Sequence, residues 1–452
     1  MTAERDLPAL REVVGPHHVL TDADATAGYV VDWTGRFRGH TPAVVRPGSV
    51  AEVAAIVDVC RTHELAVVPQ GGNTGLVGGS VPLAGEIVVS LRRLDALEID
   101  ASAAQATAGA GVTIASLQAA ARAAGWDYGV DWSARESATV GGSVATNAGG
   151  VRVIRHGDTR ANLLGVEAVL ADGSTISRLG GLIKDNTGYP LGALLCGSEG
   201  TLGLVTAARL RLVPRRDERV VALLGFDDLT TAMDAVASLR RSLATLDACE
   251  LVLASGVQLV AAAIGAAPPF EAAVTILAEC ADTTDPTDAV ASAIDGLRTS
   301  AVAVASEAAR RADLWRWREQ HTEAINRLGP PIKLDVTLPL GALGPFIAEV
   351  PARVRAVAPT TATWLFGHAA DGNVHVNVTG WDASDERAIE DAVLAFVVDS
   401  GGSISAEHGI GVAKRDWLTA DRGVADVAAM RAVKQALDPT GILNPNVLFS
   451  RE

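Results

Sequence analysis

Two short, glycine-punctuated segments near the C-terminal end carry residue types that bind metals and move protons. They read GHAADGNVHVN and SAEHGIG, and the residues of interest in them are His368, His375, Glu407 and His408. Imidazole and carboxylate groups together suit a divalent transition metal such as zinc. Imidazole also exchanges protons near neutral pH. Any one of these residues is compatible with a structural role, but the set predicts an enzyme whose chemistry is done here.

The pattern around the histidines predicts a β-hairpin that would bring two of them together. Apolar and polar residues alternate up to His368 and again from His375 onward, and such a period of two places each set on one strand face. Asp371-Gly372 between them favours a tight turn. Glu407-His408, with glycines at 409 and 411, predicts a loop that can approach the same place.

Composition bounds the classes of protein that this chain can be. At 452 residues it is long enough for two or more domains, and 48% hydrophobic residues can fill large cores. The net charge of −15 argues against a nucleic-acid or anionic-membrane partner. We expect no membrane span, because no apolar run approaches ~20 residues, and the first residues resemble neither a signal nor a transit peptide.

The cysteines predict a reducing compartment. The four, at positions 60, 196, 249 and 280, are scattered, lie in apolar settings and form no CxxC pair. We therefore expect buried thiols in a cytoplasmic protein.

The first half of the chain alternates predicted strands and helices. Ser49 to His63 has the apolar spacing of a helix capped by Ser49, and Thr113 to Ala124 predicts a second helix. Leu65–Pro69 reads as a strand that runs straight into glycines. A charged, proline-marked segment at 214–218 predicts a domain boundary.

Three glycine-rich clusters in this half could cradle a phosphate. They are GGNTG at 71–75 followed by Gly78-Gly79, the region 137–150, and GSEGTLG at 197–203. Glycine lets backbone N–H groups close around a phosphate without a Cβ in the way. Three such clusters indicate a long ligand with a pyrophosphate. None fits the GxGxxG or Walker A pattern in its context, so we expect the ligand on some other fold.

These motifs resemble those of a known family. VPQGGNTGLVGG at 68–79, SATVGGSVATNAGG at 137–150 and CGSEGTLGLVT at 196–206 are similar to the flavin-binding domain of the vanillyl-alcohol oxidase/p-cresol methylhydroxylase superfamily. The C-terminal half resembles the cap of FAD-linked oxidases. Within the superfamily, residues 40–450 look most like the FAD-dependent D-2-hydroxyacid dehydrogenases, especially the D-2-hydroxyglutarate dehydrogenase family.

The resemblance implies an α+β protein. It would have a two-part FAD-binding domain of the p-cresol methylhydroxylase type and an α+β cap domain with an antiparallel sheet. The division expected is an N-terminal helical arm at 1–39, the FAD-binding domain at 40–217, the substrate/cap domain with a metal site at 218–430, and a C-terminal segment returning to the flavin domain at 431–452.

The resemblance also implies bound FAD. Some superfamily members attach FAD through a histidine in the first cluster; here that loop offers Asn73, so we expect non-covalent FAD. The cofactor-binding residues implied are Pro69, Gln70, Gly71, Gly72, Asn73, Thr74, Gly75, Ser137, Thr139, Gly141, Gly142, Asn147, Gly197, Glu199, Gly200 and Asn446. Two departures affect this set: Glu136 stands where relatives often have glycine, and the tail reads NPNVLF where many have NPGK.

For the reacting centre, the resemblance implies a divalent metal, with zinc favoured, on His368, His375 and Glu407. His408 would be the catalytic base, and Asn377 would help to hold the substrate. The match extends to Arg318, Thr322 and Lys333, which correspond in type and spacing to residues that the D-2-hydroxyglutarate family uses on substrate carboxylate. Arg318 and Thr322 lie four apart on a predicted helix and so share a face. In a chain of charge −15, a local positive pocket must attract an anionic substrate.

The expected reaction is oxidation of a small anionic D-2-hydroxyacid to the 2-oxoacid, with hydride transfer to FAD. D-2-hydroxyglutarate is the favoured substrate, and D-lactate, D-malate or glycolate are alternatives. A non-catalytic flavin subunit that relays electrons is an alternative of another class, but it would not need the histidine and glutamate set. The electron acceptor stays open between a quinone, an electron-transfer flavoprotein and others, and a homodimer is left open.

Overall fold

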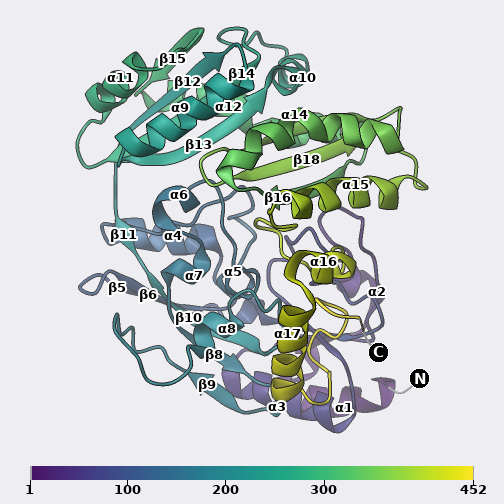
Figure 1. The fold of residues 1–452 in the computed structure, drawn as a ribbon. Helices are drawn as coiled ribbons and strands as arrows, with labels where there is room; N and C mark the ends of the chain where they lie inside the picture. The colour runs from purple at the N-terminus through teal and green to yellow at the C-terminus, as the bar shows by residue number, and fades with distance from the viewer. Residues whose placement is uncertain (1–2, 451–452) are drawn as a thin grey trace. The chain divides into compact units, whose positions relative to one another are not determined.

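The computed structural model describes residues 3–450, which divide into two compact units (Figure 1). Unit 1 comprises Met1–Gly150, Gly157–Arg215 and Glu407–Glu452, and unit 2 comprises Val151–His156 and Arg216–Ala406. The boundary between the units at Arg215 and Arg216 lies within the proline-marked segment 214–218. The chain returns to unit 1 at Glu407, earlier than the expected 431, and the short segment Val151–His156 joins unit 2.

Unit 1 begins with a small sheet of order β1-β2-β4-β3. Its strands are β1 (Val19–Leu20), β2 (Val44–Val45), β4 (Ile87–Ser90) and β3 (Val67–Gln70). The last three run parallel, and β1 is antiparallel to β2. Helix α3 (Val50–Thr62) packs on this sheet and begins where expected, because the Ser49 side chain accepts a hydrogen bond from Glu52 N at 3.2 Å.

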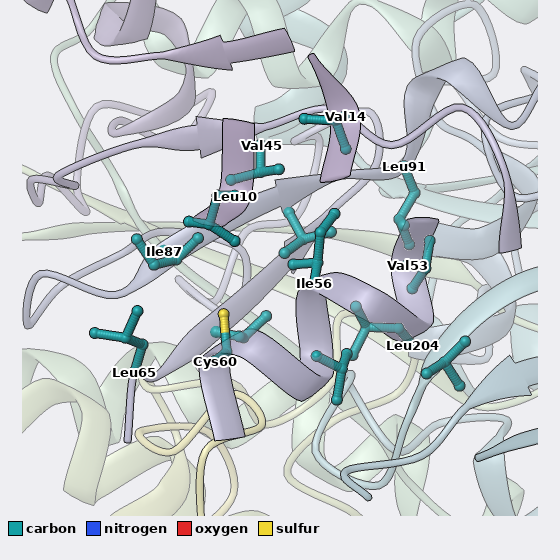
Figure 2. Packing of buried hydrophobic residues seen from close by; sticks show 14 of the residues in the cluster. Leu10, Val14, Val45, Val53, Ile56, Cys60, Leu65, Ile87, Leu91 and Leu204 are labelled. Atoms are coloured by element: carbon teal, nitrogen blue, oxygen red, sulfur yellow. The ribbon is translucent and has the colours of Figure 1, made fainter. Parts of the chain in front are cut away.

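The N-terminal helix α1 (Ala3–Val14), which begins the helical arm expected at 1–39, packs into this core. Figure 2 shows Leu10 and Val14 beside Ile56 and Cys60 of α3, with Val45 and Ile87 of the strands. Leu10, Ile56 and Cys60 have no exposed surface. Burial of such side chains is worth about 1.5–3 kcal/mol each, so α1 is held by the same apolar cluster as α3.

A second sheet in unit 1 has the order β5-β6-β10-β8-β9 and is antiparallel throughout. Its strands are β5 (Leu97–Asp100), β6 (Gln105–Gly109), β10 (Leu204–Arg211), β8 (Leu163–Val169) and β9 (Thr175–Ser177), with a separate two-stranded pair β7 (Trp126–Asp127) and β11 (Val213–Pro214). Helix α4 (Ile114–Ala123) packs on this sheet where the sequence predicts a helix, and the Thr113 side chain caps it.

Short helices complete unit 1. They are α2 (Ala23–Thr26), α5 (Val140–Thr146), α7 (Thr159–Asn162), α8 (Leu191–Leu195), α16 (Leu418–Arg422), the longer α17 (Val424–Leu437), and the 3-10 turns η1 (Pro16–His18), η2 (Ala27–Tyr29), η3 (Leu91–Arg93) and η4 (Arg415–Trp417). The four cysteines are buried thiols distributed over both units.

Unit 2 is built on a seven-stranded antiparallel sheet of order β15-β12-β14-β13-β17-β18-β16. The strands are β15 (Ala301–Ala305), β12 (Glu218–Phe226), β14 (Val274–Asp282), β13 (Leu246–Leu253), β17 (Ala362–His368), β18 (Asn373–Thr379) and β16 (Ile332–Thr337). Among residues 3–450, no helix combines the length and apolarity needed to cross a bilayer.

Two groups of helices contact this sheet (Figure 1). The first group is α9 (Leu229–Ser242), α14 (Leu340–Val357) and α15 (Glu386–Asp399), and α11 (Thr287–Asp295) packs on α9. The second is α10 (Ala254–Ile264), α12 (Ala308–Glu319) and α13 (His321–Asn326). The second group shares its apolar clusters with Val221, Leu223, Val252 and Phe366 of the strands.

A buried carboxylate ties helix α6 (Val153–His156) into unit 2. Asp247 at the start of β13 is 1% exposed and pairs with Arg155 at 3.0 Å, Arg219 at 3.1 Å and His156 at 3.3 Å. Burial acts to raise the pKa of Asp247, but the hydrogen bond from His156 and the nearby arginine charges outweigh it and hold the pKa well below its usual range. The carboxylate therefore stays ionised and anchors the segment that follows the second glycine cluster.

Candidate active site

The register of four neighbouring strands gathers the expected histidines on one sheet face of unit 2. Phe366 of β17 lies opposite Val252 of β13 on one side and His375 of β18 on the other, and His375 lies opposite Asp335 of β16. His368 lies opposite Glu250 of β13. Residues two apart share a face. The pairing therefore sets Glu250, His368, His375 and Asp335 close together on the face that carries Phe366.

The hairpin predicted from Asp371-Gly372 is confirmed. Gly372 has φ +87°, and a Cβ there would lie 2.2 Å from the Leu338 carbonyl oxygen, so only glycine fits this turn. The Asp371 side chain accepts a hydrogen bond from Asn373 N at 3.2 Å. The turn brings the rings of His368 and His375 edge to face, with centroids 5.4 Å apart.

Each of the two histidines has a carboxylate at its Nδ1 atom. His368 Nδ1 lies 2.6 Å from Glu250 Oε1, and His375 Nδ1 lies 3.3 Å from Asp335 Oδ1. An ionised carboxylate at Nδ1 favours the tautomer with the proton there, which makes Nε2 the lone-pair atom. A carboxylate behind an imidazole is the usual support of a metal-binding histidine. The two residues therefore fit a divalent metal through Nε2.

Glu250 and Asp335 are both fully buried. Burial acts to raise the pKa of Glu250, but His368 and Arg318 outweigh it and lower the pKa to about 2. Asp335 accepts a hydrogen bond from Asn373 Nδ2 at 2.7 Å. Asp335 and His375 also offer ligand atoms within 4.8 Å of each other, so Asp335 is itself a candidate cation ligand. Neither acid was among the sequence-predicted site residues.

Arg318 of α12 meets the same face. Its Nε atom lies 2.6 Å from Glu250 Oε2, and its guanidinium carbon lies 4.5 Å from the centroid of the Phe366 ring. The arginine is therefore held both by a charge pair and by an aromatic face. Thr322 lies on α13, so the single helix predicted for these two residues is divided. Gln320, with ψ of −5°, ends α12 and precedes α13.

Lys333 and Asn377 lie opposite each other on β16 and β18. Asn377 is 5% exposed, and its Nδ2 is a buried donor without a hydrogen-bond partner among residues 3–450. A buried unsatisfied amide is costly, and a ligand carboxylate would satisfy it. Burial lowers the pKa of the Lys333 ammonium. The Lys333 ammonium and the Asn377 amide thus form a corner of this strand pair, called here the anion-binding corner, that could bind a carboxylate.

In unit 1, the first two glycine clusters lie against each other. A Cβ at Gly71 would lie 2.2 Å from Thr139 Oγ1, and one at Gly72 would lie 2.1 Å from Ser137 O. Asn73 adopts φ +55°, and its Nδ2 donates to Val31 O at 2.8 Å. Glycine at 72 is therefore required by a backbone contact between the clusters, and glycine at 71 leaves room for the Thr139 hydroxyl.

The second and third clusters are also joined. Asn147 has φ +52°, and the N–H of Glu199 donates to Ala145 O at 2.7 Å. A Cβ at Gly200 would meet Pro69 Cγ at 2.4 Å, which joins the third cluster to the first. Backbone strain of this kind gathers at ligand sites, so the joined clusters are a suitable cradle for a dinucleotide.

Glu407 and His408 belong to unit 1 and follow directly on Ala406, whose N–H donates to Asp335 O at 3.3 Å. Glu407 Oε1 accepts a hydrogen bond from Gly150 N at 2.9 Å. The buried Glu199 side chain accepts from Ile410 N and Gly411 N, each at 2.8 Å. The loop that carries His408 is thus fixed from both sides by carboxylates.

The C-terminal tail is held by asparagines. Asn444 Nδ2 donates to Gly79 O and to Glu199 O, each at 2.8 Å. The amide of Asn446, an expected cofactor residue, donates to Glu86 Oε1 at 2.5 Å. The tail residue that links the glycine clusters is therefore Asn444.

Comparisons with known proteins agree with this geometry. Residues 41–178 match the family described as "FAD binding domain", and residues 215–448 match "FAD linked oxidases, C-terminal domain". A D-2-hydroxyglutarate dehydrogenase from Xanthomonas citri pv. viticola is 37% identical over 470 residues, which cover 99% of this chain and 98% of that protein. The mitochondrial D-2-hydroxyglutarate dehydrogenase of Bos taurus is 37% identical, with 98% and 83% covered.

Solved structures share the fold. A p-cresol methylhydroxylase with substrate bound has a TM-score of 0.81 at 17% identity, over 98% of this chain and 96% of that one. A 4-ethylphenol oxidase from Gulosibacter chungangensis has a TM-score of 0.75 at 19% identity, with 100% and 98% covered. The predicted α+β fold of the p-cresol methylhydroxylase type, with an antiparallel sheet in the cap, is confirmed.

Proposed function

We propose that this chain, which belongs to the D-2-hydroxyglutarate dehydrogenase family of FAD-linked oxidoreductases, oxidises D-2-hydroxyglutarate or a similar D-2-hydroxydiacid. The observation that carries the proposal is the sheet face of unit 2. There, two histidines backed by carboxylates lie beside Arg318 and the anion-binding corner of Lys333 and Asn377. D-lactate, D-malate and glycolate are the alternative substrates.

The cofactors would supply the redox chemistry and the Lewis acid. FAD would supply a hydride acceptor for C2 of the substrate, and a divalent metal, zinc in our proposal, would supply a Lewis acid for the substrate hydroxyl oxygen. His368, His375 and Glu407 would hold the metal, with the Nδ1 contacts of both histidines supporting this role. The three joined glycine clusters of unit 1 would hold FAD.

The chain's own residues orient the substrate and move its proton. Arg318, Thr322 and Lys333 would bind the distal carboxylate of a diacid. Asn377 would help to hold the substrate, and its buried unsatisfied donor supports this role. His408 would remove the hydroxyl proton as general base. The electron acceptor stays open between a quinone, an electron-transfer flavoprotein and other acceptors. The formation of a homodimer is also open.

Arg318→Ala is expected to lower kcat/KM for D-2-hydroxyglutarate by at least about thirtyfold. Truncating one partner of a desolvated charge pair costs about 2–5 kcal/mol, and ~1.4 kcal/mol is a factor of ten. D-lactate has no distal carboxylate, so its smaller kcat/KM should change much less. Lys333→Ala is expected to show the same difference. The measurement is kcat/KM for both acids with an artificial electron acceptor.

Arg310→Ala is the matched control, because Arg310 lies on the same helix and its side chain is 78% exposed. It should leave both substrates unchanged. Equal losses on both acids in the Arg318 and Lys333 variants would assign these cations to the α-carboxylate. A wild-type preference for D-lactate would overturn the diacid assignment.

Purified protein is expected to carry one FAD without a covalent bond. The first glycine cluster offers Asn73 and no histidine, and the Asn73 side chain is engaged by Val31 O and by Ser80, whose hydroxyl lies 2.8 Å from it. Acid precipitation should release the flavin into the supernatant. Yellow colour that persists in the washed pellet would contradict the non-covalent assignment.

A further inference from the structure

Glu250 is a buried acid that no motif in the sequence marks, yet it contacts two residues of the proposed site. It lies on β13, has no exposed surface, and places Oε1 at 2.6 Å from His368 Nδ1 and Oε2 at 2.6 Å from Arg318 Nε. We propose that Glu250 is a positioning residue that couples the metal side of the site to its substrate-carboxylate side. This inference rests on the proposed function.

On the histidine side, Glu250 would set which nitrogen can bind a metal. A carboxylate can only accept at Nδ1, so the proton stays there and Nε2 keeps its lone pair. A glutamine could turn its NH₂ group toward Nδ1, which would move the proton to Nε2 and block coordination. Loss of such a support typically lowers metal affinity 10–100-fold.

On the arginine side, Glu250 fixes the plane of the guanidinium. Its Oε2 takes the Nε donor, and the Phe366 ring lies against the guanidinium carbon at 4.5 Å. The donors on Nη1 and Nη2 then form an oriented fork that can meet a carboxylate with two parallel hydrogen bonds. Because the Glu250 charge offsets that of Arg318, Arg318 would contribute mainly geometry and Lys333 the net attraction for the anion.

These roles lead to an expectation opposite to that of simple electrostatics. Removing a negative charge beside Arg318 should, on charge alone, strengthen the binding of a dianionic substrate. If Glu250 instead positions both partners, its removal should weaken both metal binding and recognition of the diacid. The sign of the change therefore separates the two explanations.

Glu279 provides a matched control in the same sheet. It lies on the neighbouring strand β14, is 7% exposed, and pairs with Arg219 and with Trp315 Nε1, the latter at 2.6 Å. Glu279→Gln thus neutralises a comparable buried acid–arginine pair that touches none of the proposed site residues. This variant therefore shows how the loss of a buried carboxylate outside the proposed site affects unit 2.

The experiment compares Glu250→Gln, Glu250→Asp and Glu279→Gln with the wild type. Zinc affinity is measured by competition with a chromophoric chelator, independently of turnover. The ratio of kcat/KM for D-2-hydroxyglutarate over D-lactate is measured on zinc-saturated protein, and thermal unfolding is recorded for each variant. We expect Glu250→Gln to lose at least about tenfold in zinc affinity and at least about tenfold in the diacid/lactate ratio. Glu279→Gln should keep both near wild type.

Glu250→Asp tests the same proposal if the glutamine variant does not fold. The shorter side chain keeps the charge but cannot reach both partners, so at least one of the two readouts should fall. The proposal would be overturned if Glu250→Gln had the same zinc affinity and substrate ratio as Glu279→Gln. A preference for the diacid that rises in Glu250→Gln would also overturn it. A wild type that binds zinc but does not oxidise the diacid would instead overturn the proposed function. In that case the zinc titration would still test the role of Glu250 at His368.

Discussion

Replacing His408 by alanine is expected to lower kcat for D-2-hydroxyglutarate by about 10²–10⁴-fold, the usual contribution of a positioned general base. The loop around it should survive the change, because its anchors are the bonds of Glu407 to Gly150 N and of Glu199 to Ile410 N and Gly411 N. None of these involves the imidazole. FAD content should therefore stay at the wild-type level while the chemical step slows.

The measurement is the rate of flavin reduction in a single turnover, which separates chemistry from re-oxidation by the acceptor. His63→Ala is the matched control, since His63 is an exposed histidine at the end of α3. Added imidazole should restore part of the rate in His408→Ala and have no effect on the control. A loss of less than about tenfold in His408→Ala would rule out the assignment of this residue as the base.

Removal of the metal is expected to abolish turnover while the flavin absorption spectrum stays nearly intact. A Lewis acid on the substrate hydroxyl is worth several kcal/mol. At ~1.4 kcal/mol per tenfold, a loss on the order of 10³-fold should follow dialysis against a chelator. Re-added zinc should restore the activity. The flavin spectrum should not change, because the expected FAD contacts come from the glycine clusters and not from His368 or His375.

His375→Ala should reproduce the effect of chelation, because it removes a ligand that Asp335 supports at 3.3 Å. The variant should bind zinc weakly and should not recover with added metal at concentrations that restore the dialysed wild type. Full activity in protein shown to be free of metal by elemental analysis would contradict a catalytic metal.

Local sequence patterns predicted the parts of the site that lie on one hairpin. Alternation on both sides of Asp371-Gly372 was enough to pair His368 with His375, because a tight turn fixes the register of its two strands. The cap at Ser49 was predictable for the same reason, since it depends on a neighbour three residues away.

Residues contributed from distant strands could not be predicted in this way. Glu250 lies 118 residues from His368, and only the order β13-β17-β18-β16 brings them together. The available signal was an acid inside an apolar run, LDACELVLA at 246–254, since a buried acid requires a partner. Asp335 carries the same signal in IKLDVTL. Neither pattern identifies the partner of the acid, so the pairing of Glu250 with His368 and Arg318 is visible only in the structure.

For the same reason, the packing of the N-terminal helix and the positions of the domain boundaries could not be predicted from local sequence. Helix α1 packs through Leu10 and Val14 onto α3, which follows later in the chain, so no local pattern reveals this contact. The return of the chain to unit 1 at Glu407 has no composition change to mark it. Both features depend on packing between segments that are far apart in sequence.

The central claim is that this chain removes hydride from a D-2-hydroxydiacid, and a single-turnover experiment without oxygen tests it most directly. Purified, zinc-loaded protein is mixed with D-2-hydroxyglutarate, and the loss of the oxidised-flavin absorption is followed together with the product by mass spectrometry. We expect one 2-oxoglutarate formed per flavin reduced, slower reduction by D-lactate, and none by the L-enantiomer. Flavin that stays oxidised with D-2-hydroxyglutarate, or that D-lactate reduces faster, would contradict the proposed function.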